Sequence, residues 1–333
     1  MTTNTAVIAT LEEAGGAVGF GYAPTFGFGT AALRVLAADD LAPRLIGVEL
    51  RDATDGVRHL LRDAWIAGRP AGLVRHAVAL LELALYDLDG QLAGLPLHRL
   101  WGQSTGAVRA YASGGWRHLS IEALTTLARE WTDRGFEAMK IQVGLSPRED
   151  AARLQAVREV VGPDVELMVD ANQRIPIDAA VDWSAALAPF RPAWLEEPVP
   201  ADRHAELASL RGSTSIPIAA GESETEPSEL EDLLRREAVD VLQPDVHRCG
   251  LTATRAIGTE ATRSDVTVAP HMAHEIGAQV MSGAHGGGWL EYFDWFEDWW
   301  ESPVTPSLGR IQPAGLPGHG LRLRPGWLES HAI

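Results

Sequence analysis

The sequence predicts an α/β fold, a (β/α)₈ barrel of the TIM type preceded by a region of different character. Two observations predict it: eight short apolar segments recur between positions 108 and 293, and amphipathic helical segments separate them. A chain of 333 residues is long enough for one large domain or two ordinary ones, with a substantial core.

The first hundred residues predict a hairpin followed by helices. Apolar residues at 6–10 and 18–22 flank a segment that places the hairpin turn at Gly15-Gly16. Helical patterns follow at 30–36, 56–66 and 71–93, and the last of these is long and apolar on one face. The final forty residues are rich in turn formers, so we expect them to fold back onto this first region.

The barrel region alternates predicted strands with predicted helices. In a (β/α) barrel the chemistry lies at the carboxyl ends of the strands, so functional residues are expected there. The helical segments include 121–134, 148–161 and 228–236. The predicted strands cover 108–112, 138–143, 165–170, 193–198, 216–220, 239–244, 266–270 and 288–293.

Composition excludes several classes of protein. With 28 basic and 45 acidic residues the formal net charge is −17, so a nucleic-acid partner is not expected. Cys249 is the only cysteine, which rules out an intrachain disulfide and a zinc–thiolate cluster. The sequence contains no signal-peptide pattern and no apolar run that could span a membrane, so we expect a cytoplasmic protein without a membrane partner.

Lys140 stands out because it is the only lysine among the 28 basic residues. An ammonium group can be tuned or deprotonated, whereas a guanidinium group stays charged. A single lysine therefore reflects either chance survival at an exposed position or chemistry that arginine cannot perform. Its place at the end of the second barrel strand favours chemistry.

Acidic residues end three neighbouring strands of the predicted barrel. Asp170, Glu196 and Glu222 follow one another at intervals of 26 residues, which is one strand–helix unit each time. Three like charges at one barrel mouth repel strongly unless a cation lies among them. Carboxylate oxygens suit Mg²⁺, which keeps open positions for a substrate, so we predict a Mg²⁺ site on these three residues.

Asp245 and His271 end the next two strands. A carboxylate that holds one imidazole nitrogen fixes the tautomer and leaves the other nitrogen free to act as a general base. We therefore expect a catalytic pair here rather than a core histidine bonded to a backbone carbonyl. Lys140 is expected to reach the same mouth from the opposite side.

Glu291 ends the eighth strand and is expected to face the mouth, as a general acid or as a partner of substrate hydroxyls. The two residues after the sixth strand end, His247-Arg248, are interpreted as a solvated turn. The aromatic residues around Glu291 are expected to form a seam between domains: Trp289, Tyr292, Phe293, Trp295, Trp299 and Trp300.

In order and spacing, these strand ends resemble the enolase superfamily, specifically the acid-sugar dehydratases of its mandelate racemase-like branch. The match extends over most of the chain. The motifs that carry it are Lys140-Ile-Gln142, Val169-Asp-Ala-Asn172, Trp194-Leu-Glu-Glu-Pro198, Gly221-Glu222, Gln243-Pro-Asp245, Ala269-Pro-His271 and Leu290-Glu-Tyr292.

The resemblance implies a modified, TIM-like (β/α) barrel at 108–301 under an α+β capping domain built from 1–107 and the C-terminal segment 302–333. It also implies that Mg²⁺ holds the substrate carboxylate and stabilises the enediolate formed when the α-proton leaves. By position it implies catalytic residues Lys140, Asp245, His271 and Glu291, substrate-binding residues Gln142 and Asn172, and metal ligands Asp170, Glu196 and Glu222.

Two features depart from the family pattern. The racemases carry a second lysine two positions after the first, where this chain has Gln142, an amide that cannot accept and return a proton. One base on one face of the substrate favours β-elimination over racemisation. The sequence also starts at the family's second strand, which implies either a misassigned start or a site more open than usual.

The predicted function is therefore a Mg²⁺-dependent dehydratase of a sugar acid, an aldonate or an aldarate, that yields a 2-keto-3-deoxy acid. A racemase or epimerase of a 2-hydroxy acid, using Lys140 and His271, is the alternative among enzymes. A catalytically silent metal-binding barrel and a non-enzymatic assembly protein are the alternatives from other classes. We also expect the loop at 23–30 to contribute to specificity and the chain to form a homo-oligomer.

Overall fold

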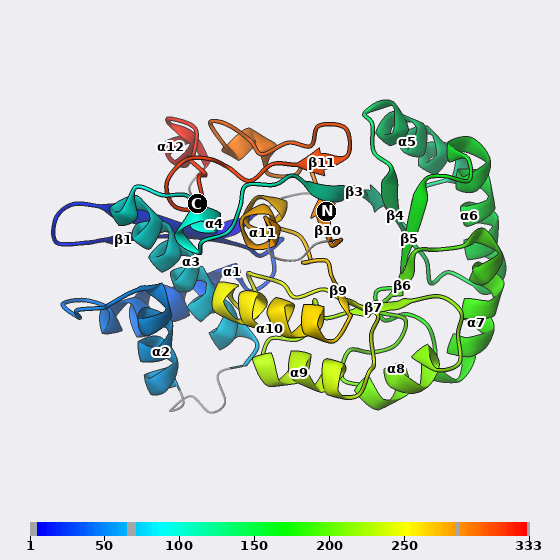
Figure 1. The fold of residues 1–333 in the computed structure, drawn as a ribbon, viewed down its shortest axis with the longest axis horizontal. Coiled ribbons are helices and arrows are strands. Elements are labelled where there is room, and N and C mark those ends of the chain that lie inside the picture. The colour runs from blue at the N-terminus through cyan, green and yellow to red at the C-terminus, as the bar shows by residue number, and fades with distance from the viewer. Residues whose placement is uncertain (1–4, 65–70, 284–286, 332–333) are drawn as a thin grey trace.

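The fold is taken from a computed structural model that describes residues 5–64, 71–283 and 287–331. Eight parallel strands stand side by side in it and form the predicted barrel, which is closed except between β9 and β10, the two ends of the described ladder (Figure 1). The strands are β3 (Val108–Gly115), β4 (Ala138–Gln142), β5 (Glu166–Asp170), β6 (Trp194–Glu196), β7 (Ile218–Ala220), β8 (Val241–Leu242), β9 (Thr267–Val268) and β10 (Trp289–Tyr292).

One α-helix lies between each pair of consecutive barrel strands. Ser120 and Ser146 cap the N-termini of the first two barrel helices. Each serine side chain accepts a hydrogen bond from a backbone N–H of the first turn. After β10 the described chain continues into a short 3₁₀ turn rather than an eighth helix, which is the modification of the barrel. The helices are α5 (Ile121–Asp133), α6 (Pro147–Val161), α7 (Ala180–Leu187), α8 (His204–Arg211), α9 (Pro227–Arg235), α10 (Leu251–Arg263) and α11 (His274–Met281).

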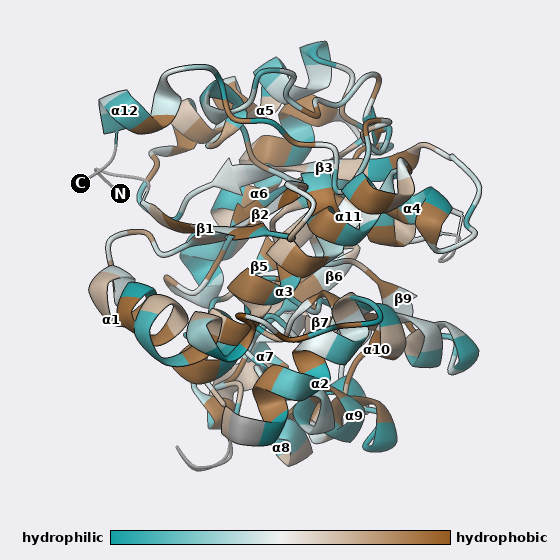
Figure 2. Ribbon diagram, turned by 90° about the vertical axis from the view of Figure 1, so that its left-hand side faces the viewer, coloured by the Kyte–Doolittle hydropathy of each residue, from teal (hydrophilic) through white to brown (hydrophobic). Residues whose placement is uncertain are grey.

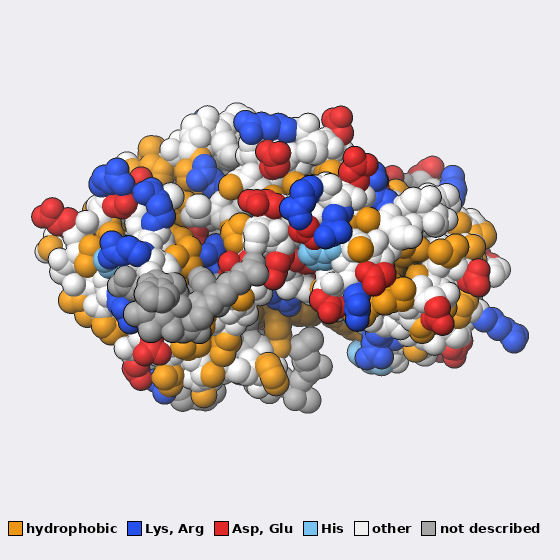
Figure 3. Space-filling view, turned by 90° about the horizontal axis from the view of Figure 1, so that it is seen from below, with side chains coloured by type: hydrophobic (Ala, Val, Ile, Leu, Met, Phe, Trp, Pro, Cys, Tyr) orange, Lys and Arg blue, Asp and Glu red, His pale blue; other side chains and the backbone are white. Residues whose placement is uncertain are grey.

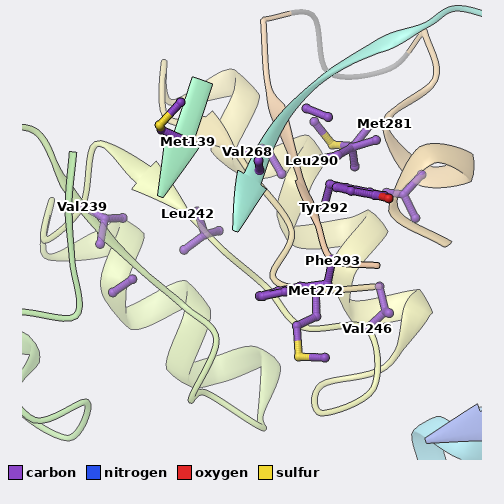
Figure 4. Close-up of a cluster of buried hydrophobic side chains, with 14 of the residues drawn as sticks. Met139, Val239, Leu242, Val246, Val268, Met272, Met281, Leu290, Tyr292 and Phe293 are labelled. Carbon is purple, nitrogen blue, oxygen red and sulfur yellow. The ribbon is translucent and has the colours of Figure 1, made fainter. Parts of the chain in front are cut away.

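Strand alternation sorts the barrel side chains into an inner and an outer layer. In β4, Met139 and Ile141 pack outward in the large core beneath the helices, part of which is shown in Figure 4. Lys140 and Gln142 therefore share the inner face with Ala138. Below them the barrel interior is filled by Tyr111, Ala138, Met168, Trp194, Ala219, Val241, Ala269 and Trp289.

A capping layer of a hairpin and helices lies beside the barrel (Figure 1). The hairpin strand β2 lies directly against the long helix α3, and Gly21 permits this approach, because a Cβ there would lie only 2.3 Å from the Leu80 carbonyl oxygen. Figure 2 shows that α3 is largely hydrophobic, as expected for a helix packed on both sides. The elements are β1 (Ala6–Glu12), β2 (Val18–Pro24), α1 (Thr30–Val35), a π-helical turn (Leu36–Leu41), a 3₁₀ turn (Ala42–Arg44), α2 (Ala53–Ala64), α3 (Leu73–Ala93) and α4 (Leu97–Leu100).

The surface carries both signs of charge. Figure 3 shows acidic and basic side chains intermingled over the face that it displays, so the net negative charge does not gather into one field there. Across the described residues, no helix has the length and apolar character needed to cross a membrane.

The C-terminal segment contacts both parts of the molecule. Its strand β11 (Arg310–Ile311) pairs antiparallel with barrel strand β3, and it ends in α12 (Trp327–His331). Further along, the buried Asp87 carboxylate of α3 accepts hydrogen bonds from the backbone N–H groups of His319, at 3.0 Å, and of Phe20 in β2, at 3.1 Å. Asp87 therefore joins the hairpin, the long helix and the C-terminal segment.

We expect Asp87→Ala to lower the free energy of unfolding by about 2–4 kcal/mol, because one buried and one partly buried backbone donor lose a charged acceptor. Thermal and urea denaturation monitored by circular dichroism would measure this. Asp87→Asn is the matched control, since its amide oxygen can still accept one bond and should retain part of the stability. Equal stability of Asp87→Ala and the unaltered protein would contradict this account of the junction.

Candidate functional site

The predicted site residues meet at the carboxyl ends of the barrel strands. In the sheet register, Gln142 of β4 lies beside Asp170 of β5, which in turn lies beside Glu196 of β6. A cavity of about 200 Å³ opens at this end of the barrel. Seven of the nine predicted residues line it: Lys140, Gln142, Asp170, Asn172, Glu222, His271 and Glu291.

The other two predicted residues, Glu196 and Asp245, are buried behind this lining. Each contacts a lining residue: Glu196 Oε1 lies 2.6 Å from Lys140 Nζ, and Asp245 Oδ2 lies 2.9 Å from His271 Nδ1. A larger groove of about 590 Å³ runs between helices α2, α9 and α10 and contains none of the predicted residues. Chemistry rather than size therefore marks the smaller cavity as the candidate site.

The Lys140 ammonium lies among three carboxylates. Its Nζ is 2.6 Å from Glu196 Oε1, 2.7 Å from Glu291 Oε1 and 3.4 Å from Asp170 Oδ2. Burial by itself would lower the pKa of Lys140, but the charges of Glu196 and Glu291 outweigh burial and raise the pKa well above its ordinary value. Lys140 therefore places a fixed positive charge at the cavity.

The three carboxylates predicted as metal ligands form an oxygen donor set that fits a hard divalent cation. Burial and the neighbouring carboxylates raise the pKa of Asp170 well above its ordinary value, and burial also raises the pKa of Glu196. Asp170 and Glu196 turn toward Lys140, and in the described part of the chain no three His, Cys, Asp or Glu side chains converge on one point as ligands. The ammonium thus offsets charge that a bound cation would offset more fully.

Asp245 and His271 form the predicted pair. The Asp245 carboxylate is held by the backbone N–H of His247, which donates to Oδ1 at 2.7 Å, while Oδ2 contacts His271 Nδ1 at 2.9 Å. The second ring nitrogen, Nε2, lies 3.4 Å from Glu222 Oε2. Burial by itself would lower the pKa of His271, but Glu222 and the hydrogen bond with Asp245 raise the pKa to about 9. Nε2 is thus the nitrogen left to exchange a proton at the cavity.

The Gln142 amide is held in place by hydrogen bonds on both of its polar atoms. Its Nε2 donates to Asn172 Oδ1 at 2.7 Å, and its Oε1 accepts from the backbone N–H of Arg117 at 3.1 Å. The Asn172 side chain in turn donates to Asp170 Oδ2 at 3.0 Å. A chain of amides therefore runs from the position of the family's second lysine to a candidate metal ligand.

The interpretation of His247-Arg248 as a solvated turn is wrong. His247 is buried, and Arg248 lines the cavity, where its guanidinium donates to the Glu222 carbonyl oxygen at 2.8 Å and lies 3.4 Å from Asp245 Oδ2. The turn folds inward because Asp245 accepts the His247 N–H. One signal in the sequence could have identified Arg248: it lies three residues after Asp245, and the loops at this end of a barrel build the site.

Two further supporting residues were not selected from the sequence, although both belong to the Trp194–Pro198 motif. The Trp194 indole donates to Glu196 Oε2 at 3.0 Å, because residues two apart on a strand share one face. Glu197 accepts from Ser223 at 2.6 Å and from Gln173 at 3.0 Å, and burial together with Glu222 raises its pKa to about 7.

The aromatic residues near Glu291 do not all lie at the seam: Trp289 belongs to the barrel interior. Trp300 lies at the seam with the cap, where its ring is 5.2 Å from that of Tyr22 in β2. Phe293 and Trp295 do not follow the seam prediction, because they line the cavity together with Trp116. The turn after β10 decides which of these side chains point into the cavity and which point toward the cap. The sequence pattern does not specify that turn.

Fold and site together define a capped (β/α)-barrel protein with a carboxylate-rich mouth. Residues 1–102 match the model of the mandelate racemase/muconate lactonizing enzyme N-terminal domain, and residues 123–327 match that of the enolase C-terminal domain-like family. The chain therefore belongs to the enolase superfamily, in its mandelate racemase-like branch, as the sequence motifs predicted.

Relatives within this branch differ in the reaction they catalyse. The chain is 29% identical to a 3,6-anhydro-alpha-L-galactonate cycloisomerase of Streptomyces coelicolor, over 94% of this chain and 87% of that one. It is 31% identical to the L-talarate/galactarate dehydratase of Salmonella typhimurium, over 86% of this chain and 72% of that one. The crystal structure of an L-talarate dehydratase from Polaromonas sp. JS666, complexed with Mg and L-glucarate, superposes with a TM-score of 0.89 at 33% identity, covering 97% of this chain and 90% of that one.

A second cluster of titratable residues lies outside the cavity lining. His204, the first residue of α8, places Nε2 3.2 Å from Glu224 Oε1 and Nδ1 2.9 Å from Asp232 Oδ2 of α9. The hydrogen bond to Glu224 is the main cause that raises the pKa of His204, with burial opposing and Asp232 adding. The imidazolium therefore joins helices α8 and α9.

We expect this cluster to stabilise the fold most at mildly acidic pH. A raised folded-state pKa contributes stability that is complete below about pH 6.5, the unfolded value, and is lost as the pH rises through the folded value. Melting temperatures of the unaltered protein and of His204→Gln, measured from about pH 5.5 to 9, should differ most at the acidic end. A difference that grew with pH would show that the neutral ring is the stabilising form.

Proposed function

We propose that this protein is a Mg²⁺-dependent dehydratase of a sugar acid. It would remove the proton α to the carboxylate and expel the β-hydroxyl, which yields a 2-keto-3-deoxy acid. The observation that carries the proposal is the Asp245-held His271 imidazole, which faces the carboxylates across one small cavity. The dehydratases among the relatives, and a neighbour complexed with Mg and L-glucarate, support the same reaction class.

Asp170, Glu196 and Glu222 are the residues that would hold Mg²⁺. Their buried oxygen donors and the raised pKa values of Asp170 and Glu196 support this assignment. When bound, Mg²⁺ supplies positive charge for the substrate carboxylate and for the enediolate that develops from it. Lys140, at 3.4 Å from Asp170, adds a second positive charge on the same side.

His271 carries the proton chemistry. Its Nε2 takes the α-proton, so the electron pair of the broken C–H bond passes to the carboxylate as an enediolate. The enediolate electrons then expel the β-hydroxyl, which leaves as water after receiving a proton from the His271 imidazolium. Asp245 stabilises that imidazolium through Nδ1, 2.9 Å away. The enol product then gains a proton at carbon three and loses the proton from the oxygen on carbon two, which gives the 2-keto-3-deoxy acid.

The arrangement favours elimination over racemisation. A racemase needs a second group that returns the proton to the opposite face, and Gln142 cannot do so because an amide does not exchange protons as an acid or a base. Hydrogen bonds on both of its polar atoms hold it in place as a neutral group. Lys140, the other candidate, is held as an ammonium by Glu196 and Glu291. One face of the substrate therefore meets a base, and the other meets fixed hydrogen-bond donors and charge.

We expect a screen of aldonic and aldaric acids with Mg²⁺ to identify a substrate by formation of a 2-keto acid, measured as the semicarbazone. Chelation with EDTA should abolish the activity, and added Mg²⁺ should restore it. His271→Asn should lower kcat by about 10²–10⁴-fold, because the general base is lost. His59→Asn in the cap helix α2 is the matched control and should leave kcat unchanged. Activity that survived both chelation and His271→Asn would refute the proposal.

We also expect turnover in D₂O to leave the recovered substrate in its original configuration, since one base returns a proton only to the face it came from. Proton NMR of substrate and product during the reaction would measure this. An accumulating epimer that disappears in Lys140→Met would instead establish the racemase or epimerase alternative.

A further inference from the structure

One side of the cavity is built of aromatic rings. Phe26, Trp116, Phe293 and Trp295, which we call the aromatic wall, all line it. Trp116 follows β3, whereas Phe293 and Trp295 follow β10, and these two strands are neighbours in the barrel. Phe26 comes from the loop after β2 of the cap, within the segment 23–30.

The rings of the aromatic wall support one another. The rings of Trp295, Phe293 and Trp116 stack on one another, with centroids 4.0 Å apart for Phe293–Trp295, 5.5 Å for Trp116–Trp295 and 6.1 Å for Trp116–Phe293. Phe26 meets Trp295 edge-on at 5.4 Å. Such stacked and edge-to-face contacts hold the rings in place. Phe293 is buried, whereas Phe26, Trp116 and Trp295 are only half-buried. The wall is therefore a preformed apolar surface that still has area left to cover.

The charged groups lie elsewhere in the cavity. Its basic lining residues, among those that the structure describes, are Lys140, Arg248 and His271. Each is already bound to carboxylates of the candidate site: Lys140 to Glu196 and Glu291, and both Arg248 and His271 to Asp245. These basic groups thus belong to the end where the proposed function places the reacting carboxylate, and no described basic lining residue stands within the aromatic wall.

This division determines what the far end of a substrate meets. In a cavity of about 200 Å³, a sugar acid whose carboxylate lies at the charged end has its remaining carbons close to the aromatic wall. A second carboxylate there would lose its hydration without gaining a charged partner, which is costly. A methyl group or another surface of C–H bonds would gain from contact with the rings.

We propose that the substrate is a monocarboxylic sugar acid with an uncharged, C–H-rich far end, such as a 6-deoxyaldonate, and not an aldarate. The inference rests on the proposed function, because it names the substrate class of the same site. It separates this chain from the similar protein crystallised with L-glucarate, which carries two carboxylates. The aromatic wall is the specificity-determining element.

The test compares acids that differ only at the far end. Matched sets of 6-deoxyaldonate, aldonate and aldarate, prepared in the galacto, gluco and manno configurations, isolate the end group from the stereochemistry. Within the configuration that reacts, we expect kcat/KM to fall from 6-deoxyaldonate to aldonate to aldarate, with at least about tenfold between the first and the last. An aldarate that reacts as well as its 6-deoxyaldonate, or better, would overturn the inference.

Variants of Trp295 test the wall itself. Trp295→Arg places a cation among the rings and should shift the ratio of kcat/KM toward the aldarate by about tenfold. Trp295→Leu, which removes the ring without adding charge, should lower kcat/KM for the 6-deoxyaldonate without raising kcat/KM for the aldarate. Trp327→Leu in α12, outside the cavity lining, is the matched control and should leave the ratio unchanged. If the ratio of kcat/KM for the two acids is identical in Trp295→Arg and the unaltered protein, the aromatic wall does not determine specificity.

Binding separates this inference from the proposed function. Calorimetric titration of the same acids into His271→Asn with Mg²⁺ reports affinity without turnover. If no acid is converted to a 2-keto acid but the 6-deoxyaldonate still binds more tightly than the aldarate, the dehydratase proposal fails and the inference stands. If keto acid forms from the aldarate in preference, the dehydratase proposal stands and the inference fails.

Discussion

The barrel mouth concentrates more negative charge than its own cations can balance, and the rest of the site depends on this imbalance. Five buried carboxylates, those of Asp170, Glu196, Glu222, Asp245 and Glu291, form their ion pairs with permanent cations of the described residues through Lys140 and Arg248. Isolated charges in such surroundings would neutralise by taking up protons, so the site must recruit positive charge to keep its carboxylates ionised. Under the proposed function a divalent cation would supply that charge, and the same excess of carboxylates raises the pKa of His271.

Strand register converts this electrostatic demand into a defined geometry. Because Gln142, Asp170 and Glu196 lie side by side in neighbouring strands, their positions are fixed by backbone hydrogen bonds rather than by loops. Large side chains fill the barrel directly below, and one of them, Trp194, donates its indole N–H to Glu196 at 3.0 Å. A site built on strands and supported by a packed interior keeps its acids in place despite their repulsion.

The sequence made the acids and the base predictable because a regular interval of one strand–helix unit brings successive strand ends to the same rim. The sequence also singled out Lys140 as a site residue, because it is the only lysine in a chain whose other basic residues are arginines. The contacts of Arg248 and the division of the aromatic run were not predictable in this way. Trp116 and Trp295 are 179 positions apart and meet only because β3 and β10 are neighbours and a turn after each directs the ring inward. No periodic pattern encodes such a turn, so side-chain direction there is known only from the fold.

The two ends of the cavity therefore bear on different aspects of function, namely the class of reaction and the choice of substrate. The charged end is built from strand residues and motifs that place the chain in the enolase superfamily, so it reports on the class of reaction. The wall is built from loops after β2, β3 and β10, and such loops vary without disturbing the barrel. Substrate choice in this chain should accordingly follow Phe26, Trp116 and Trp295, and a relative's named substrate is informative only to the extent that these rings recur in it.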